Sequence, residues 1–353
     1  MKKIIAAATA LLVAAGMFTG CGANAKPTAQ DNKLKIVTTI FPEYDWTREI
    51  LGDQSERAEV TMLLDNGVDL HSYQPTADDL IKIAECDLFI YVGGESDGWV
   101  ESALASTSNP ERKVINLIDT LGDSVKLEEV VEGMQETEHD HDHEEGEEHD
   151  HDDDHAHDAD EEHSDADDHD HDHEAETDEH VWLSLRNAQA VCQKIAEKLG
   201  EIDPEHEQAY TQNALAYIDQ LAALDAKYQA AVDAANKKTL VFGDRFPFRY
   251  LTEDYGLNYY AAFVGCSAET EASFETIRFL AEKTDALGLG HVLTIENPNH
   301  KIAETVVANT TGKNQQVLSM NSMQSVTSKD VAEGATYLSI MEHNLEVLTQ
   351  ALQ

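Results

Sequence analysis

Basic residues are scarce in this chain of 353 residues, where 24 Lys and Arg stand against 69 Asp and Glu for a formal charge of -45. Because a strongly acidic protein surface repels phosphates, we expect no nucleic-acid partner. Cysteine is also scarce. Beyond Cys21 an odd number remains, namely Cys86, Cys192 and Cys266, which argues against a disulfide framework. At most one pair could form, and the sequence does not choose it.

Long apolar runs are missing apart from one near the start. Residues 4–18 are apolar and uncharged, follow two lysines, and are too short to cross a bilayer as a helix. We therefore interpret residues 1–20 as a signal peptide. Residues 18–21 (Phe-Thr-Gly-Cys) resemble a bacterial lipobox, which implies a lipid on Cys21 and a tether over residues 21–33. The alternative is an ordinary signal peptide with an incidental cysteine.

One internal segment is dominated by acidic residues and histidine. Residues 136–179 hold 25 acidic residues and no Lys or Arg, while 44 acidic and 24 basic residues lie outside them. With almost no apolar side chains, the segment cannot offset the entropy of ordering, so we expect a disordered insertion. Imidazoles beside carboxylates suit divalent ions, and the alternative is a solubilising acidic linker. Its histidines are His139, His141, His143, His149, His151, His155, His157, His163, His169, His171 and His173.

Strand-like and helix-like segments alternate on both sides of this insertion. Such alternation predicts parallel βαβ units and therefore α/β lobes. We expect a first lobe over residues 34–135, with strands at 34–40, 57–63, 87–92 and 114–118. We expect a second lobe over residues 237–353, with strands at 239–242, 259–264, 291–295 and 316–320.

Helical patterns fill residues 180–236, which would complete the first lobe and link it to the second. Residues 187–199 predict one helix. Asp203 and Pro204 predict the N-cap and first residue of a longer helix that runs to about Ala235. Its apolar residues recur at helical spacing but not in sustained heptads, so we interpret it as a rigid strut rather than a coiled coil.

Two histidine motifs flank the insertion. Residues 66–80 (Asn-Gly-Val-Asp-Leu-His-Ser-Tyr-Gln-Pro-Thr-Ala-Asp-Asp-Leu) contain His71, and residues 178–184 (Asp-Glu-His-Val-Trp-Leu-Ser) contain His180. Both resemble the metal-ligand motifs of the zinc- and manganese-binding lipoproteins of ABC importers. The resemblance implies two lobes joined by one long helix, with Zn2+, or alternatively Mn2+, bound in the cleft between them. It also implies a monomer on the extracytoplasmic face of a bacterial membrane that serves an importer permease.

The second lobe departs from the motifs of this family. Gly243 stands where the family places a ligand, and it has no side chain to donate. The fourth family position, near residues 320–322, is not acidic. The ligands that this lobe supplies must therefore be sought by another rule.

Ligands of open α/β sheets gather beyond the carboxyl ends of strands, and His71 and His180 both follow strands. By the same rule, Asp244, Glu296 and His300 are candidates, although Asp244 could instead pair with Arg245 or Arg249. Cys266 would be a soft ligand, with a buried thiol as the alternative. We expect a carboxylate to complete the site, which would then be harder than three histidines and admit manganese more readily.

Two other functions compete with metal capture for transport. An exported zinc hydrolase would need an open coordination position and a general base. The sequence contains neither an H-E-x-x-H nor a Gly-x-Ser-x-Gly motif. A nickel or copper buffer built on the histidine-rich segment is the other alternative. We expect a binding protein rather than an enzyme.

Overall fold

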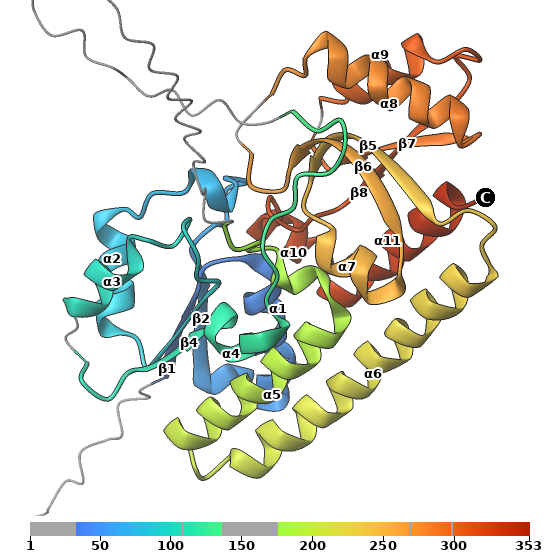
Figure 1. Ribbon diagram of the computed structural model, residues 1–353. Helices are drawn as coiled ribbons and strands as arrows, with labels where there is room; N and C mark the ends of the chain where they lie inside the picture. Colours follow the sequence, from blue (N-terminus) through green and yellow to red (C-terminus); the bar gives the residue numbers. More distant parts are fainter. Residues whose placement is uncertain (1–32, 107–108, 136–175, 268–269, 298) are drawn as a thin grey trace, which may run out of the picture. The chain divides into compact units, whose positions relative to one another are not determined.

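The computed structural model describes residues 33–106, 109–135, 176–267, 270–297 and 299–353 (Figure 1). The expected signal peptide, Cys21 and the eleven histidines of the insertion lie outside this part of the chain, so their predictions stay predictions. Within it, no helix combines the length and the apolar character that a membrane span requires.

The first α/β lobe is built on a four-stranded parallel sheet with the order β2-β1-β3-β4. Each of its four strands overlaps one of the four segments predicted as strands for this lobe. Apolar side chains such as Phe89 and Ile90 in β3 are fully buried, as expected where helices cover both faces of a sheet. The elements are β1 (Leu34–Thr38), α1 (Phe41–Leu51), β2 (Ala58–Met62), α2 (Ala77–Glu85), β3 (Leu88–Tyr91), α3 (Val100–Ala105), β4 (Lys113–Asn116) and α4 (Leu117–Leu121).

Two long helices follow, α5 (Leu185–Ile202) and α6 (Glu207–Ala234). The helix α6 begins three residues later than Pro204 predicts. Asp203 instead ends α5, and its carboxylate accepts hydrogen bonds from His206 Nδ1 and the Tyr210 hydroxyl, which fixes the turn between the helices. With 28 residues, α6 is about 42 Å long, and it runs alongside α5 and on to the second lobe (Figure 1). The strut interpretation fits this course.

The second lobe repeats the topology of the first, with the parallel strand order β6-β5-β7-β8. The register of β5 against β6 shifts between Phe242 and Arg245, which marks a bulge next to the carboxyl end of β5. The elements are β5 (Thr239–Phe246), α7 (Arg249–Tyr255), β6 (Asn258–Val264), α8 (Phe274–Ala286), β7 (His291–Ile295), α9 (Lys301–Asn309), β8 (Gln316–Met320), α10 (Ser328–Ala332) and α11 (Tyr337–Ala351). The two-lobed α/β prediction is confirmed.

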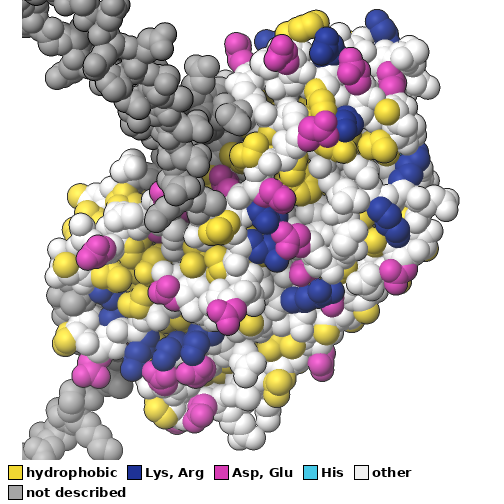
Figure 2. All heavy atoms as spheres, viewed as in Figure 1, with side chains coloured by type: hydrophobic (Ala, Val, Ile, Leu, Met, Phe, Trp, Pro, Cys, Tyr) yellow, Lys and Arg dark blue, Asp and Glu magenta, His cyan; other side chains and the backbone are white. Residues whose placement is uncertain are grey.

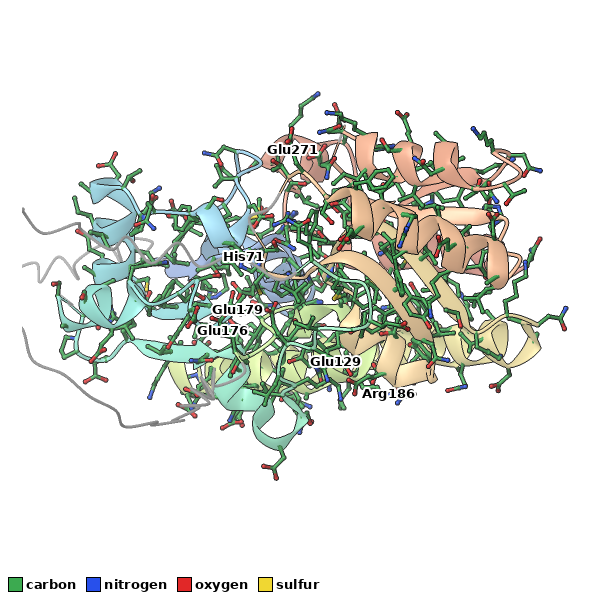
Figure 3. The ribbon with its side chains drawn as sticks, turned by 45° about the horizontal axis from the view of Figure 1, so that its top comes forward. His71, Glu129, Glu176, Glu179, Arg186 and Glu271 are labelled. Atoms are coloured by element: carbon green, nitrogen blue, oxygen red, sulfur yellow. The ribbon has the colours of Figure 1, made fainter. Side chains whose placement is uncertain are left out.

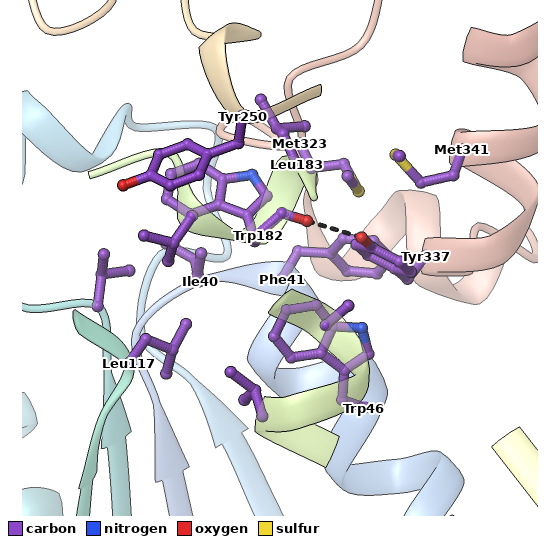
Figure 4. Close-up of a cluster of buried hydrophobic side chains, with 14 of the residues drawn as sticks. Ile40, Phe41, Trp46, Leu117, Trp182, Leu183, Tyr250, Met323, Tyr337 and Met341 are labelled. Atoms are coloured by element: carbon purple, nitrogen blue, oxygen red, sulfur yellow. Dashed lines mark hydrogen bonds between the residues drawn. The ribbon is translucent and has the colours of Figure 1, made fainter. Parts of the chain in front are cut away.

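One aromatic cluster belongs to the core of both lobes (Figure 4). Tyr337 of α11 donates its hydroxyl to the Trp182 carbonyl at 2.6 Å, and its ring meets that of Trp46 edge-on at a centroid distance of 5.0 Å. The Trp182 indole N–H donates to the Ser322 carbonyl at 2.8 Å. Because Trp182 is fully buried, this cluster fixes the backbone two residues beyond His180.

Candidate metal centre

His71 lies in a short 3-10 turn, η2 (Leu70–Ser72), beyond the end of β2. The Asp69 carboxylate caps this turn by accepting the His71 backbone N–H at 3.0 Å, and Leu70 is buried in the core. The side-chain Nδ1 of His71 lies 2.8 Å from Ser96 Oγ and 3.4 Å from Glu179 Oε2. Figure 3 shows His71 and Glu179 near one another where the N-terminal ribbons approach the C-terminal ones. These contacts hold the ring and leave Nε2 pointing away from them.

His180 is fully buried and comes directly before the 3-10 turn η4 (Val181–Leu183), whose side chains are all core residues. One carboxylate oxygen of Asp178 accepts both the backbone N–H and Nδ1 of His180, each at 2.9 Å. A carboxylate accepts but does not donate, so the nitrogen turned to Asp178 is the one that carries a proton, and Nε2 is the nitrogen left to bind a metal ion.

The two Nε2 atoms meet at 3.2 Å. Two imidazole nitrogens bound to one tetrahedral zinc at 2.0–2.1 Å lie about 3.3 Å apart. The outward Nδ1 atoms have acceptors, as metal-bound histidines almost always do. The pair therefore already has the nitrogen-to-nitrogen separation of two ligands of one cation.

Two further side chains lie beside the histidine pair. Cys266, His71 and His180 form a group whose ligand atoms all lie within 4.8 Å of one another, and within the described ranges it is the one group of three or more His, Cys, Asp and Glu that could hold a metal. The Gln324 amide, oriented so that its NH2 group donates to Asp69, accepts a hydrogen bond from His180 Nε2 at 2.9 Å, which a bound metal ion would replace. A soft sulfur and a neutral oxygen therefore lie beside the two Nε2 atoms.

Glycine makes the approach of Cys266 possible. A Cβ atom on the preceding Gly265 would lie 2.8 Å from His180 Cε1. The Cys266 backbone N–H donates to Glu128 Oε1 at 3.0 Å, which holds the loop in place. Burial raises the pKa of the Cys266 thiol, and the nearby carboxylates of Glu128, Glu179 and Asp178 raise it further.

Carboxylates surround the centre without entering it. Burial opposes ionisation of Glu179, but hydrogen bonds with His71 and Ser96 outweigh it and lower the pKa of Glu179, so this carboxylate is ionised beside His71. Burial raises the pKa of Asp97 to about 7, and the charge of Glu179 adds to the rise. The face in Figure 2 shows acidic and basic side chains interspersed rather than one basic patch.

The chain matches the family model described as zinc-uptake complex component A, periplasmic, over residues 36–351. It belongs to this zinc-uptake family. The zinc-binding lipoprotein AdcA of Streptococcus pneumoniae is 32% identical over 99% of this chain and 61% of its own length. The high-affinity zinc uptake system protein ZnuA of Bacillus subtilis is 29% identical over 99% of this chain and 96% of its own. This chain thus spans less than two thirds of AdcA and nearly all of ZnuA.

Solved structures of the family share the fold. The zinc-bound ZnuA-like domain of Streptococcus pneumoniae AdcA aligns with a TM-score of 0.65 at 27% identity, covering 91% of this chain and 99% of that domain. The metal-dependent lipoprotein YcdH of Bacillus subtilis aligns with a TM-score of 0.67 at 24% identity, over 91% of this chain and all of its own.

The structure does not bring Asp244 to the histidine pair of this family member. Its carboxylate accepts hydrogen bonds from the Thr294 hydroxyl at 2.5 Å and from the Asn297 amide at 3.2 Å, and it is buried in the second lobe. The bulge in β5 explains the placement, because bulges redirect side chains. Gly243 also has a packing role: a Cβ there would lie 2.4 Å from the Ala303 Cα of α9.

Glu296 and His300 also serve the second lobe rather than the pair. Glu296 accepts hydrogen bonds from the Ser322 backbone and hydroxyl, both at 2.8 Å, and so fixes the loop that carries Gln324. Nε2 of His300 lies 2.8 Å from the Asn297 carbonyl, just before α9. Neither of the two carboxylates expected as ligands, Asp244 and Glu296, therefore reaches the histidine pair in the structure.

Sequence reasoning missed a contact between the lobes at the centre. Arg245 of β5 pairs with Asp69 at 2.7 Å rather than with its neighbour Asp244. In Asp69 the attraction of Arg245 and His71 outweighs burial and lowers the pKa. Arg245 and Gln324 thus reach from the second lobe to the residue that caps the His71 turn. No spacing in the sequence links positions so far apart.

The described cysteines are all free. Cys86 and Cys192 are fully buried core residues, whereas Cys266 is partly exposed. The three therefore do not share one role.

Proposed function

We propose that this chain captures Zn2+ through Nε2 of His71 and Nε2 of His180 and delivers it to the permease of an ABC importer. One observation carries the proposal: the two nitrogens lie 3.2 Å apart, which is close to the separation of two imidazole nitrogens on one tetrahedral zinc ion. The acceptors on each Nδ1, Asp178 for one ring and Ser96 with Glu179 for the other, increase the basicity of the ligating nitrogens.

Capture for transport suits this site better than catalysis. Both histidines sit on turns fixed by buried neighbours, and Gln324 from the second lobe borders the pair where a catalytic zinc would keep a water. The relatives are named for zinc binding and zinc uptake. Zinc is therefore the cargo, and its release requires the two lobes to separate enough to expose the pair.

Location and the insertion complete the proposal. A lipid on Cys21 and the tether through residue 33 would hold the monomer at the extracytoplasmic face of the membrane. The histidines between residues 139 and 173 would collect zinc weakly and pass it to the pair, since Asp178 and His180 lie only a few residues further along the chain. Removal of residues 136–175 should leave tight binding intact and abolish weak binding, which below about pH 6 is lost anyway as the imidazoles protonate.

The central test is a zinc titration of the whole chain against a chelating dye strong enough to report only the tight site. His71→Ala and His180→Ala should each weaken that site about ten-fold or more. His343→Ala, which removes an exposed histidine on α11, should change nothing. If both cleft variants hold their first zinc as tightly as the parent, the tight site lies elsewhere and the proposal fails.

A further inference from the structure

The second lobe offers a sulfur ligand at the place where a carboxylate was expected. Cys266 Sγ, His71 and His180 form the group of potential metal ligands at the centre, while the carboxylates of Asp244 and Glu296 are engaged within their own lobe. We propose that Cys266 binds the captured ion as a thiolate and makes the site select zinc over manganese. The inference rests on the proposed function, since it takes the histidine pair as the place where the ion binds.

The geometry requires only a small closure. In a tetrahedral zinc site with Zn–N of about 2.1 Å and Zn–S of about 2.3 Å, a nitrogen and a sulfur lie about 3.6 Å apart. The ligand atoms of the group already lie within 4.8 Å of one another. The distance from the thiol to each nitrogen therefore has to shorten by no more than about 1.2 Å, which a side-chain rotation or a slight approach of the lobes supplies.

The surroundings of Cys266 differ from those of a structural cysteine. Cys86 and Cys192 are completely buried, whereas Cys266 is partly exposed in the turn directly after β6. The glycine before it removes the one Cβ that would collide with His180, and Glu128 holds its backbone N–H. Arg245, which also pairs with Asp69 beside His71, reaches the Ser267 carbonyl at 3.4 Å. The loop is thus positioned from both sides with its sulfur beside the pair.

The resulting donor set is soft. Two neutral imidazoles, one thiolate and the neutral Gln324 oxygen contain no carboxylate, and thiolates favour zinc while manganese prefers carboxylate, carbonyl and water oxygens. Binding replaces the S–H bond by an S–Zn bond and releases the proton to solvent, without oxidation or reduction. The expectation that this site admits manganese readily is thereby reversed.

Cobalt and cadmium report a thiolate directly, because sulfur-to-metal charge transfer absorbs in the ultraviolet and histidine ligation does not produce that band. The whole chain would carry Cys21→Ser throughout, so that Cys86, Cys192 and Cys266 are its thiols. One equivalent of Co2+ or Cd2+ should produce the band in the parent and in Cys192→Ala, and not in Cys266→Ser or His71→Ala. The insertion contains no cysteine and cannot contribute.

A second measurement needs no variant. Zinc should protect Cys266 of the parent from alkylation, and the same concentration of manganese should not.

Cys266→Ser should also weaken zinc binding about ten-fold or more while leaving manganese binding nearly unchanged. A parent that binds zinc through His71 but shows no charge-transfer band and no protection would overturn the thiolate and leave the proposed function standing. If the zinc affinity of the parent did not depend on His71 at all, both the thiolate ligand and the proposed function would be overturned.

Discussion

Asp178 offers the sharpest test of how this centre holds its metal. One of its oxygens accepts two hydrogen bonds of 2.9 Å, from the backbone N–H and from Nδ1 of His180. Replacing Asp178 by Asn keeps an acceptor oxygen but removes the charge that makes the imidazole a stronger ligand. Replacing it by Ala removes both hydrogen bonds and frees the ring to rotate.

The magnitudes follow from these losses. Partners that orient metal-bound histidines contribute about 10- to 100-fold in affinity. We expect Asp178→Asn to weaken zinc binding about ten-fold, or about 1.4 kcal/mol, and Asp178→Ala about 100-fold, or about 2.7 kcal/mol. Glu176→Gln is the matched control, because it removes the same charge from an exposed side chain two residues away.

Competition with a chelator of known zinc affinity gives the dissociation constants, and unfolding of the metal-free variants separates binding from stability. Asp178 is itself buried and accepts these bonds without zinc, so both variants should also lose some stability. Zinc binding like that of the parent in both variants would contradict a role of Asp178 in ligation, and so would a Glu176→Gln variant that binds zinc as weakly as Asp178→Asn. Either result would mean that His180 does not depend on Asp178 for its ligating form.

Two further perturbations test the surroundings of the centre. Burial raises the pKa of Asp97 to about 7 from an unperturbed value of 3.8, so the folded chain holds a proton that the unfolded chain loses between those values; its stability should therefore fall by on the order of 4 kcal/mol as the pH rises from about 4 to above 7. Urea denaturation of the metal-free chain at pH 5 and pH 8 measures this difference in the free energy of unfolding, and Asp97→Asn should make it smaller. An equal difference in variant and parent would contradict the raised pKa of Asp97. Gly265→Ala would place a Cβ 2.8 Å from His180 Cε1 and 3.0 Å from the Phe246 carbonyl, so we expect a loss of about 1–3 kcal/mol in stability together with weaker zinc binding. Thermal unfolding and zinc titration measure the two effects, whereas Gly288→Ala, with no atom within 4 Å of the new Cβ, should disturb only the backbone and leave zinc affinity unchanged.

Local patterns sufficed for the elements and for half of the site. Strands and helices alternate in the sequence, and apolar runs such as β3 are apolar because both faces of a parallel sheet are covered. His71 and His180 each lie in a continuous motif whose neighbours, Asp69 in one and Asp178 in the other, also contact the ring or its backbone. Where the partners of a residue lie a few positions away, their types and spacing are legible in the sequence.

The second half of the site depends on contacts between distant segments. Asp244 follows the strand-end rule, yet a bulge of one residue in β5 turns its carboxylate to Thr294 and leaves Arg245 to meet Asp69. From the sequence, Gly243 stands where the family places a ligand, but in the structure its backbone packs so closely against α9 that a side chain would not fit. Cys266 and Gln324 reach His180 from loops that no local pattern connects with it. The sequence by itself determined two α/β lobes and a histidine from each flank of the insertion, because these follow from short-range patterns. Only the tertiary structure decided which atoms of the second lobe face them, because side-chain direction at a strand end changes with a shift of a single residue in register.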